Sequence, residues 1–343
     1  MCIDIKVIKK EVRDFLIINF SLIAFISIFI FIRVAKPNSI SFLSSFAGLF
    51  MYIPAFSAIT VLNRSSYYAF PSSIYRFFNI FSIATITKII LCIIESLFIN
   101  NLRISFLVDV LVSCYLITSI FMNSSDFEIL NLCFNKNLKK VMFVILLSLI
   151  ITTISNFSQL ESMQINHINI FDSIMRVLFI VGLNIVFGCN LFFGEEFGWR
   201  YFLQPRLQNL YGKRLGVILL GPIWGIWHLP LCVTLYSPES PLYCIITHII
   251  ACTTLGVFLG YTYMKTENLW APMLVHLLNN SIAPIIGNSY GKVYTLNTLF
   301  YEILLYSIVF LSFLLHLNIN QQIHHFQLSQ SLSNLFVHIN LLK

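Results

Sequence analysis

Long apolar runs separated by short polar stretches constrain the fold of this chain more than any other feature. A membrane-spanning helix needs about 20 mostly apolar residues, and the chain holds about ten such segments. They are Phe15–Ile32, Phe42–Leu62, Phe77–Phe98, Ile104–Met122, Val141–Ser155, Ile174–Phe193, Leu215–Leu235, Leu242–Met264, Leu269–Ile286 and Leu299–Leu317. The chain has 58% hydrophobic and only 10% charged residues, a composition that excludes a water-soluble domain. The sequence therefore predicts an all-α, polytopic membrane protein of about ten transmembrane helices.

The net charge of +7 indicates orientation in a bilayer rather than binding to nucleic acid. Lysines and arginines are scattered at segment ends instead of gathering on one face, which excludes nucleic acid as a partner. They precede the first segment and follow the second, fourth and sixth, an alternation that predicts both termini in the cytoplasm. The first segment is long enough to span, which predicts an uncleaved helix. Composition rich in Ile, Asn, Phe and Lys favours a bacterial cell membrane.

Three regions are predicted along the chain. Residues 1–171 would form N-terminal transmembrane helices, residues 172–290 the functional core, and residues 291–343 the last helix and a polar tail. The tail contains His324, His325 and His338, which we interpret as part of an interfacial end rather than a metal site.

Most polar or reactive residues inside the apolar segments have a structural interpretation. The eight cysteines show no CxxC spacing and are interpreted as small core residues, not as disulfides or a zinc cluster. Lys88, Glu95 and Asp109 are the intramembrane charges of the N-terminal half, and we expect them to pair or to reach toward the interface. A transporter would use them as a relay, but no repeat between the halves supports that hypothesis.

Two adjacent glutamates, Glu195 and Glu196, occur in the motif GEEFGWR at the predicted end of the sixth helix. A carboxylate inside a membrane is costly unless it is paired or faces a wet cavity, so both are functional candidates. Neighbours on a helix lie about 100° apart and cannot face one cavity. Glu196 and Arg200, spaced i,i+4, are predicted to form an ion pair, which leaves Glu195 free for chemistry.

Two further motifs supply side chains that suit the addition of water to a carbonyl. Trp224 and His228 are spaced i,i+4, as are His276 and Asn280, so each pair is expected to face one cavity. Glu195 would take a proton from water, His228 would hold that water, and His276 with Asn280 would donate to the oxyanion. Alternatively, Glu195, His228 and His276 would bind zinc with one open position, although HExxH is absent. Both mechanisms predict amide hydrolysis.

The motifs EExxxR, aromatic-xxx-H and HxxxN stand in this order on three successive apolar segments. This order resembles the family of CAAX prenyl endoproteases and bacteriocin-processing or bacteriocin-immunity membrane proteins, which includes the Ras-converting endoprotease. The resemblance implies an intramembrane protease. Its implied catalytic positions are Glu195, Glu196, Arg200, His228, His276 and Asn280. The second motif of the family often begins with Phe, whereas this chain has Trp224.

These observations predict an intramembrane endopeptidase that cleaves a membrane peptide or protein, with or without a lipid modification, near the cytoplasmic face. The alternative is a non-catalytic immunity or scaffolding protein of the same fold. Asn280 is a poor zinc ligand, which favours the glutamate mechanism without a cofactor over a zinc mechanism. The chain does not end in a CaaX box.

Overall fold

The structure, a computed structural model, describes residues 4–36, 39–99, 104–155, 170–286 and 290–316. Within these ranges every regular element is a helix and no strand occurs. The predicted polar tail with its three histidines lies outside the described residues. The predicted all-α class is confirmed.

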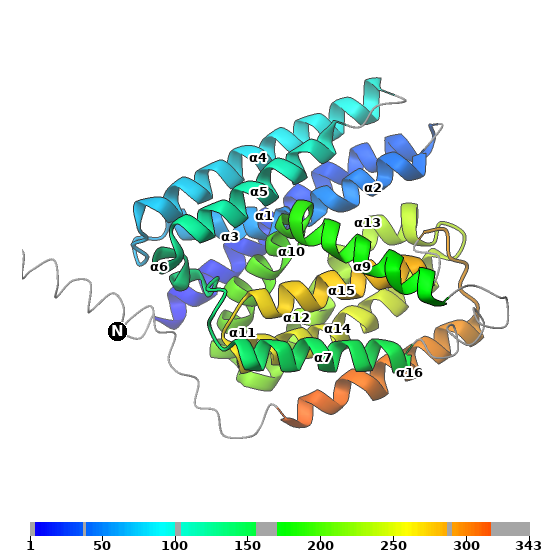
Figure 1. Cartoon of the computed structure of the whole chain (residues 1–343). Helices are drawn as coiled ribbons and strands as arrows, with labels where there is room; N and C mark the ends of the chain where they lie inside the picture. The colour runs from blue at the N-terminus through cyan, green and yellow to red at the C-terminus, as the bar shows by residue number, and fades with distance from the viewer. Residues whose placement is uncertain (1–3, 37–38, 100–103, 156–169, 287–289, 317–343) are drawn as a thin grey trace, which may run out of the picture.

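The N-terminal helices form one side of the bundle in Figure 1. They are α1 (Ile5–Val34), α2 (Ser39–Phe50), α3 (Ile53–Arg64), α4 (Ser72–Phe98) and α5 (Ser105–Met122), followed by α6 (Ser124–Phe127) and the 3-10 turn η1 (Glu128–Leu130). Helix α1 packs against α2, α3 and α4, and α4 packs against α5. Their apolar residues form part of the main buried core, which contains many phenylalanines and also includes residues of the C-terminal helices.

The C-terminal helices surround the candidate motifs. They are α7 (Leu138–Ser155), α9 (Ile170–Phe187), α10 (Cys189–Glu196), η2 (Phe197–Leu203), α11 (Gln204–Tyr211), α12 (Lys213–Trp227), α13 (Leu229–Leu231), η3 (Cys232–Tyr236), α14 (Pro241–Thr266), α15 (Trp270–Ile286) and α16 (Leu296–His316). Both η2 and η3 are π-helical. Helix α14 packs against α12, α15 and α16, while α7 and α16 lie on the side opposite α4 and α5 (Figure 1).

Each of the ten predicted apolar segments contains helix, but ten separate spans are not confirmed. In the described residues, five helices are long and apolar enough to cross a membrane. Two bent helix pairs would raise the number to seven. The polytopic prediction therefore holds, whereas the predicted count of ten does not follow from the structure.

The predicted helix end at the GEEFGWR motif is wrong, because the chain bends before the motif and stays helical beyond it. Helix α9 gives way to α10 at Gly188 with a bend of 69°. From Cys189 the chain then runs through α10, η2 and α11 as far as Tyr211. Gly212, with φ of 86°, ends this stretch in a conformation that favours glycine. Glu195 and Glu196 consequently lie mid-helix, where neighbouring helices can enclose them.

A buried ion pair between Glu11 and Arg206 connects the first part of α1 with α11. Nε of Arg206 donates to Oε2 of Glu11 at 2.8 Å, and a second guanidinium nitrogen donates to the hydroxyl of Tyr68 at 2.8 Å. Burial raises the pKa of Tyr68 to about 12, so this hydroxyl stays protonated and donates to Glu11. The first part of α1 and the beginning of α11 therefore lie side by side.

The motif glycines allow η2 and α10 to pack directly on the break between α2 and α3. A Cβ atom at Gly194 would overlap the carbonyl oxygen of Met51. One at Gly198 would lie 2.7 Å from the carbonyl oxygen of Pro54. Both approaches are closer than real Cβ contacts, so only glycine fits. The N-terminal helices thus form one wall of the region that holds the glutamates.

Candidate active site

Glu196 is the centre of a buried charge cluster that links two distant parts of the chain. Its Oε2 lies 3.1 Å from Nε of Arg200, so the predicted ion pair forms, although η2 is π-helical rather than α-helical. Its Oε1 accepts a hydrogen bond at 2.7 Å from Nδ1 of His276 on α15. All three side chains are almost completely buried. A π-helical stretch within a helix often marks a functional site, and here it carries Arg200.

Glu195 is not a partner in this ion pair and has a different hydrogen-bond donor, as the predicted division between the two glutamates requires. It is 2% exposed, and its Oε2 accepts a hydrogen bond of 2.7 Å from the indole N–H of Trp224 on α12. Trp224 also lies against the guanidinium of Arg200, with 4.6 Å from Cζ to the ring centroid. One tryptophan therefore contacts the Glu195 carboxylate with its edge and the Arg200 cation with its face.

His276 and Asn280 share one face of α15, as their spacing predicts. Because the Glu196 carboxylate can only accept, Nδ1 of His276 carries a proton. The amide nitrogen of Asn280 lies 3.3 Å from Nε2 of His276 and can only donate, so Nε2 is an acceptor here. We predicted that His276 and Asn280 both donate to one oxyanion. For His276 to donate from Nε2, its imidazole ring must carry a second proton. Asn280 is exposed, which leaves this end of the cluster accessible.

His228 lies at the bend between α12 and α13, where the helix axis turns by 43°. Its Nδ1 donates to the carbonyl oxygen of Trp224 at 2.9 Å, which leaves the lone pair on Nε2. The two rings of Trp224 and His228 lie 5.8 Å apart, as their spacing predicts. The ring of His276 approaches the same tryptophan edge-on at 5.4 Å.

Trp224 is thus the residue around which the predicted set gathers. It contacts Glu195, Arg200, His228 and His276, while Glu196 and Asn280 join through His276. Trp224 was expected only to face the same cavity as His228, and its hydrogen bond to Glu195 was not predicted. The feature of the sequence that could have predicted this contact is the indole N–H of Trp224, because a buried tryptophan normally donates this hydrogen to an acceptor. The pairing of Glu196 with His276, 80 positions apart, had no signal in local spacing.

The residues predicted to bind zinc do not form a common site. Among the described residues, the His, Cys and acidic side chains that gather closely enough for one ion are His228, His248 and Cys252. The predicted set of Glu195, His228 and His276 therefore does not fit zinc in this geometry.

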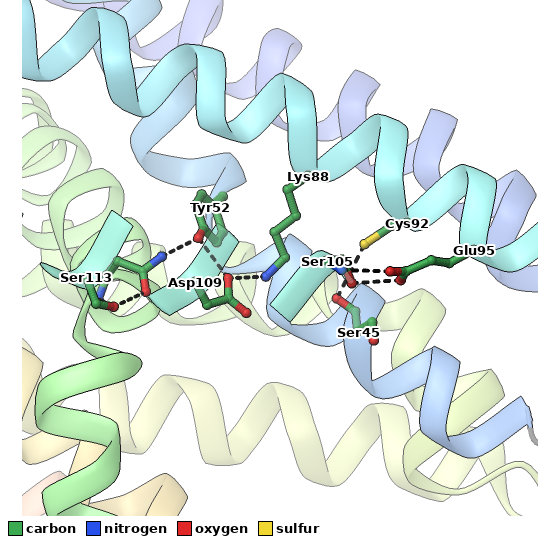
Figure 2. A network of polar contacts seen from close by, with 9 residues as sticks. Ser45, Tyr52, Lys88, Cys92, Glu95, Ser105, Asp109 and Ser113 are labelled. Carbon is green, nitrogen blue, oxygen red and sulfur yellow. Dashed lines mark hydrogen bonds and ion pairs between the residues drawn. The ribbon is translucent and has the colours of Figure 1, made fainter. Parts of the chain in front are cut away.

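A second polar network holds α10 against the N-terminal helices (Figure 2). The amide of Asn190 on α10 donates to the hydroxyl of Tyr52, which donates to Asp109 at 2.7 Å. Asp109 is also paired with Lys88, as predicted, and Ser113 donates to the amide oxygen of Asn190 at 2.5 Å. The predicted intramembrane charges therefore stabilise the packing of α10, five residues before Glu195.

Glu95 has its own partner in this network rather than Asp109. It accepts hydrogen bonds of 2.7 Å from the backbone N–H and from the hydroxyl of Ser105 (Figure 2). A carboxylate that accepts backbone N–H bonds at the start of a helix is a favourable cap for α5. This arrangement supports a structural role for Glu95.

The comparison with protein families locates these motifs in a known domain. Residues 173–282 match the model of the family described as type II CAAX prenyl endopeptidase, Rce1-like. The match begins in α9, ends in α15 and contains all six predicted site residues. Among curated proteins, no match was found. The resemblance inferred from the three motifs is confirmed for this part of the chain, and the match does not extend to α1–α7.

Proposed function

We propose that this chain, which over residues 173–282 belongs to the Rce1-like type II CAAX prenyl endopeptidase family, is an intramembrane endopeptidase. Its substrate would be a membrane-associated peptide or protein, with or without a lipid modification, cleaved near the cytoplasmic face. One observation carries the proposal. Inside a bundle of apolar helices, Trp224 contacts one carboxylate and two imidazoles, and His276 links them to a second carboxylate and to the carboxamide of Asn280.

The electrostatics of the cluster support hydrolysis through an imidazolium. Glu195 and Glu196 bring two negative charges into a region where Arg200 supplies one positive charge. A second proton on His276 would make the cluster neutral, and the Glu196 carboxylate at 2.7 Å stabilises that positive charge. The protonated ring then donates from Nε2, next to the amide of Asn280. Together they would stabilise an oxyanion.

Glu195 is the group best suited to activate water. It takes no part in the ion pair, and its hydrogen bond to Trp224 fixes the direction of its carboxylate. In the proposed reaction Glu195 accepts a proton from water, and the water oxygen bonds to the scissile carbonyl carbon. The carbon–nitrogen bond then breaks, and Glu195 returns the proton to the leaving amine. His228, whose Nε2 has a free lone pair, would hold the water.

Comparing membrane peptides from cells that express different variants tests the proposal. Cells with the wild-type protein should contain peptide fragments that are absent from cells with Glu195→Gln. Glu239→Gln is the matched control, because Glu239 is exposed and lies outside the cluster. Identical fragments for wild type and Glu195→Gln, at equal protein levels, would contradict an endopeptidase and would favour the scaffolding alternative.

A further inference from the structure

A second group of side chains lies beside the candidate active site and shares one residue with it. His248 and Cys252 are spaced i,i+4 on α14, so both project from the same helix face. That face meets His228 at the bend of α12, where the two imidazole rings lie 4.5 Å apart. One potential ligand atom from each of the three residues lies within 4.8 Å of the other two.

The hydrogen bonding of these residues leaves metal-binding atoms available. Nδ1 of His228 donates to the carbonyl oxygen of Trp224, an arrangement that also orients metal-binding histidines and leaves Nε2 with its lone pair. Nε2 of His248 is buried and has no hydrogen-bond partner among the described residues. Cys252 is a free thiol, and its Sγ lies 3.8 Å from Nδ1 of His228. A buried polar atom without a partner needs an explanation, and a bound ion supplies one.

The chemistry of the three groups selects the kind of ion. Two imidazole nitrogens and one thiolate suit Zn²⁺, whereas Mg²⁺ and Ca²⁺ require oxygen ligands. We propose that His228, His248 and Cys252 bind one Zn²⁺ ion, with water in the fourth tetrahedral position. Binding displaces the thiol proton of Cys252 to solvent. Cys252 therefore departs from the predicted role of a small core residue, whereas Cys92, Cys189, Cys232 and Cys244 are buried as predicted.

Zinc at this position would regulate the candidate active site. His228 cannot hold the attacking water while its nitrogen is bound to zinc, so occupancy inhibits hydrolysis reversibly. The inhibition rests on the proposed function, whereas the binding of zinc does not. The ion would also tie the bend at His228 to α14.

Direct binding measurements test the site without any assay of activity. The purified, metal-stripped protein is titrated with Zn²⁺ and, for a spectroscopic signal, with Co²⁺. Wild type should bind one ion per chain and show a thiolate-to-Co²⁺ charge-transfer band. His248→Gln and Cys252→Ser should weaken binding at least about 100-fold, because loss of a ligand costs more than loss of an outer-shell partner. Cys244→Ser is the matched control, since Cys244 is also buried on α14 but lies outside the cluster.

Zinc bound equally by wild type and by both ligand variants, or not bound by wild type, would overturn the site. A hydrolysis assay then tests the regulation. Neither His248 nor Cys252 belongs to the proposed catalytic set, so both variants should keep basal turnover and lose inhibition by Zn²⁺. Zinc that binds at the site and leaves hydrolysis unchanged would overturn the regulatory role. Absence of hydrolysis in every variant would contradict the proposed function and leave the binding result valid.

Discussion

The hydrogen bond from Trp224 to Glu195 predicts how the protein responds when one donor is removed. Trp224→Phe deletes the indole N–H that lies 2.7 Å from Oε2 of Glu195 and keeps an aromatic ring in the same buried place. The family resemblance indicates that a phenylalanine is compatible with the fold at this position. The substitution should therefore leave the protein folded and release the carboxylate.

The expected loss of activity follows from the strength of that bond. A hydrogen bond to a charged group contributes about 1.5–3 kcal/mol, and each 1.4 kcal/mol is a factor of about ten in rate. Trp224→Phe should thus lower kcat/KM by about 12-fold to about 140-fold, without abolishing turnover. The assay is hydrolysis of a peptide identified in the membrane comparison, by purified protein in detergent.

Trp227→Phe is the matched control for this experiment. Trp227 is equally buried, but its indole nitrogen has no hydrogen-bond partner among the described residues. The control removes the same atoms from the same helix and should cost packing only. Equal losses of kcat/KM in the two variants would refute the role assigned to the Trp224 N–H. So would full activity in Trp224→Phe.

Three further substitutions test the support of the site. Glu196→Gln leaves the Arg200 cation without its carboxylate, so we expect lower activity and a loss of about 3–5 kcal/mol in stability, measured by thermal unfolding; unchanged stability with lost activity would assign Glu196 to the chemistry instead. Asn280→Ala should lower turnover about 100-fold to about 1000-fold at unchanged substrate binding, and a change in KM alone would contradict an oxyanion donor. Tyr52→Phe leaves Asn190 and Asp109 without their shared hydroxyl and should destabilise the protein by about 1–3 kcal/mol, and an unaltered melting temperature would contradict this.

Hydropathy was sufficient to predict where the helices lie, because a segment in a membrane must satisfy its backbone hydrogen bonds internally. It did not predict the bends. At Gly188 and His228 the chain turns by 69° and 43° within runs that remain apolar, so the average composition carries no signal. The π-helical stretch over Phe197–Leu203 also keeps a helical sequence pattern, and tertiary packing selects it.

Local spacing predicted the parts of the site that lie on one helix. The i,i+4 rule anticipated the pairs Glu196–Arg200 and His276–Asn280, because neighbours on one face meet without help from the rest of the fold. Contacts between helices, such as Glu196 with His276, depend on how the bundle packs. His248 and Cys252 also share an i,i+4 spacing, but no site was predicted from it. Their third partner, His228, lies on another helix, so the packing of the helices places it beside them.

The central claim is that Glu195 activates the water that cleaves the peptide bond. The most direct measurement is turnover of the purified wild type and of Glu195→Gln after exhaustive chelation, with the metal content of both proteins determined. Wild type should retain its turnover without bound metal, and Glu195→Gln should lose at least the 100-fold to 10,000-fold, roughly, that a general base contributes. Undiminished turnover in Glu195→Gln, or wild-type activity that disappears on chelation and returns with zinc, would contradict the account.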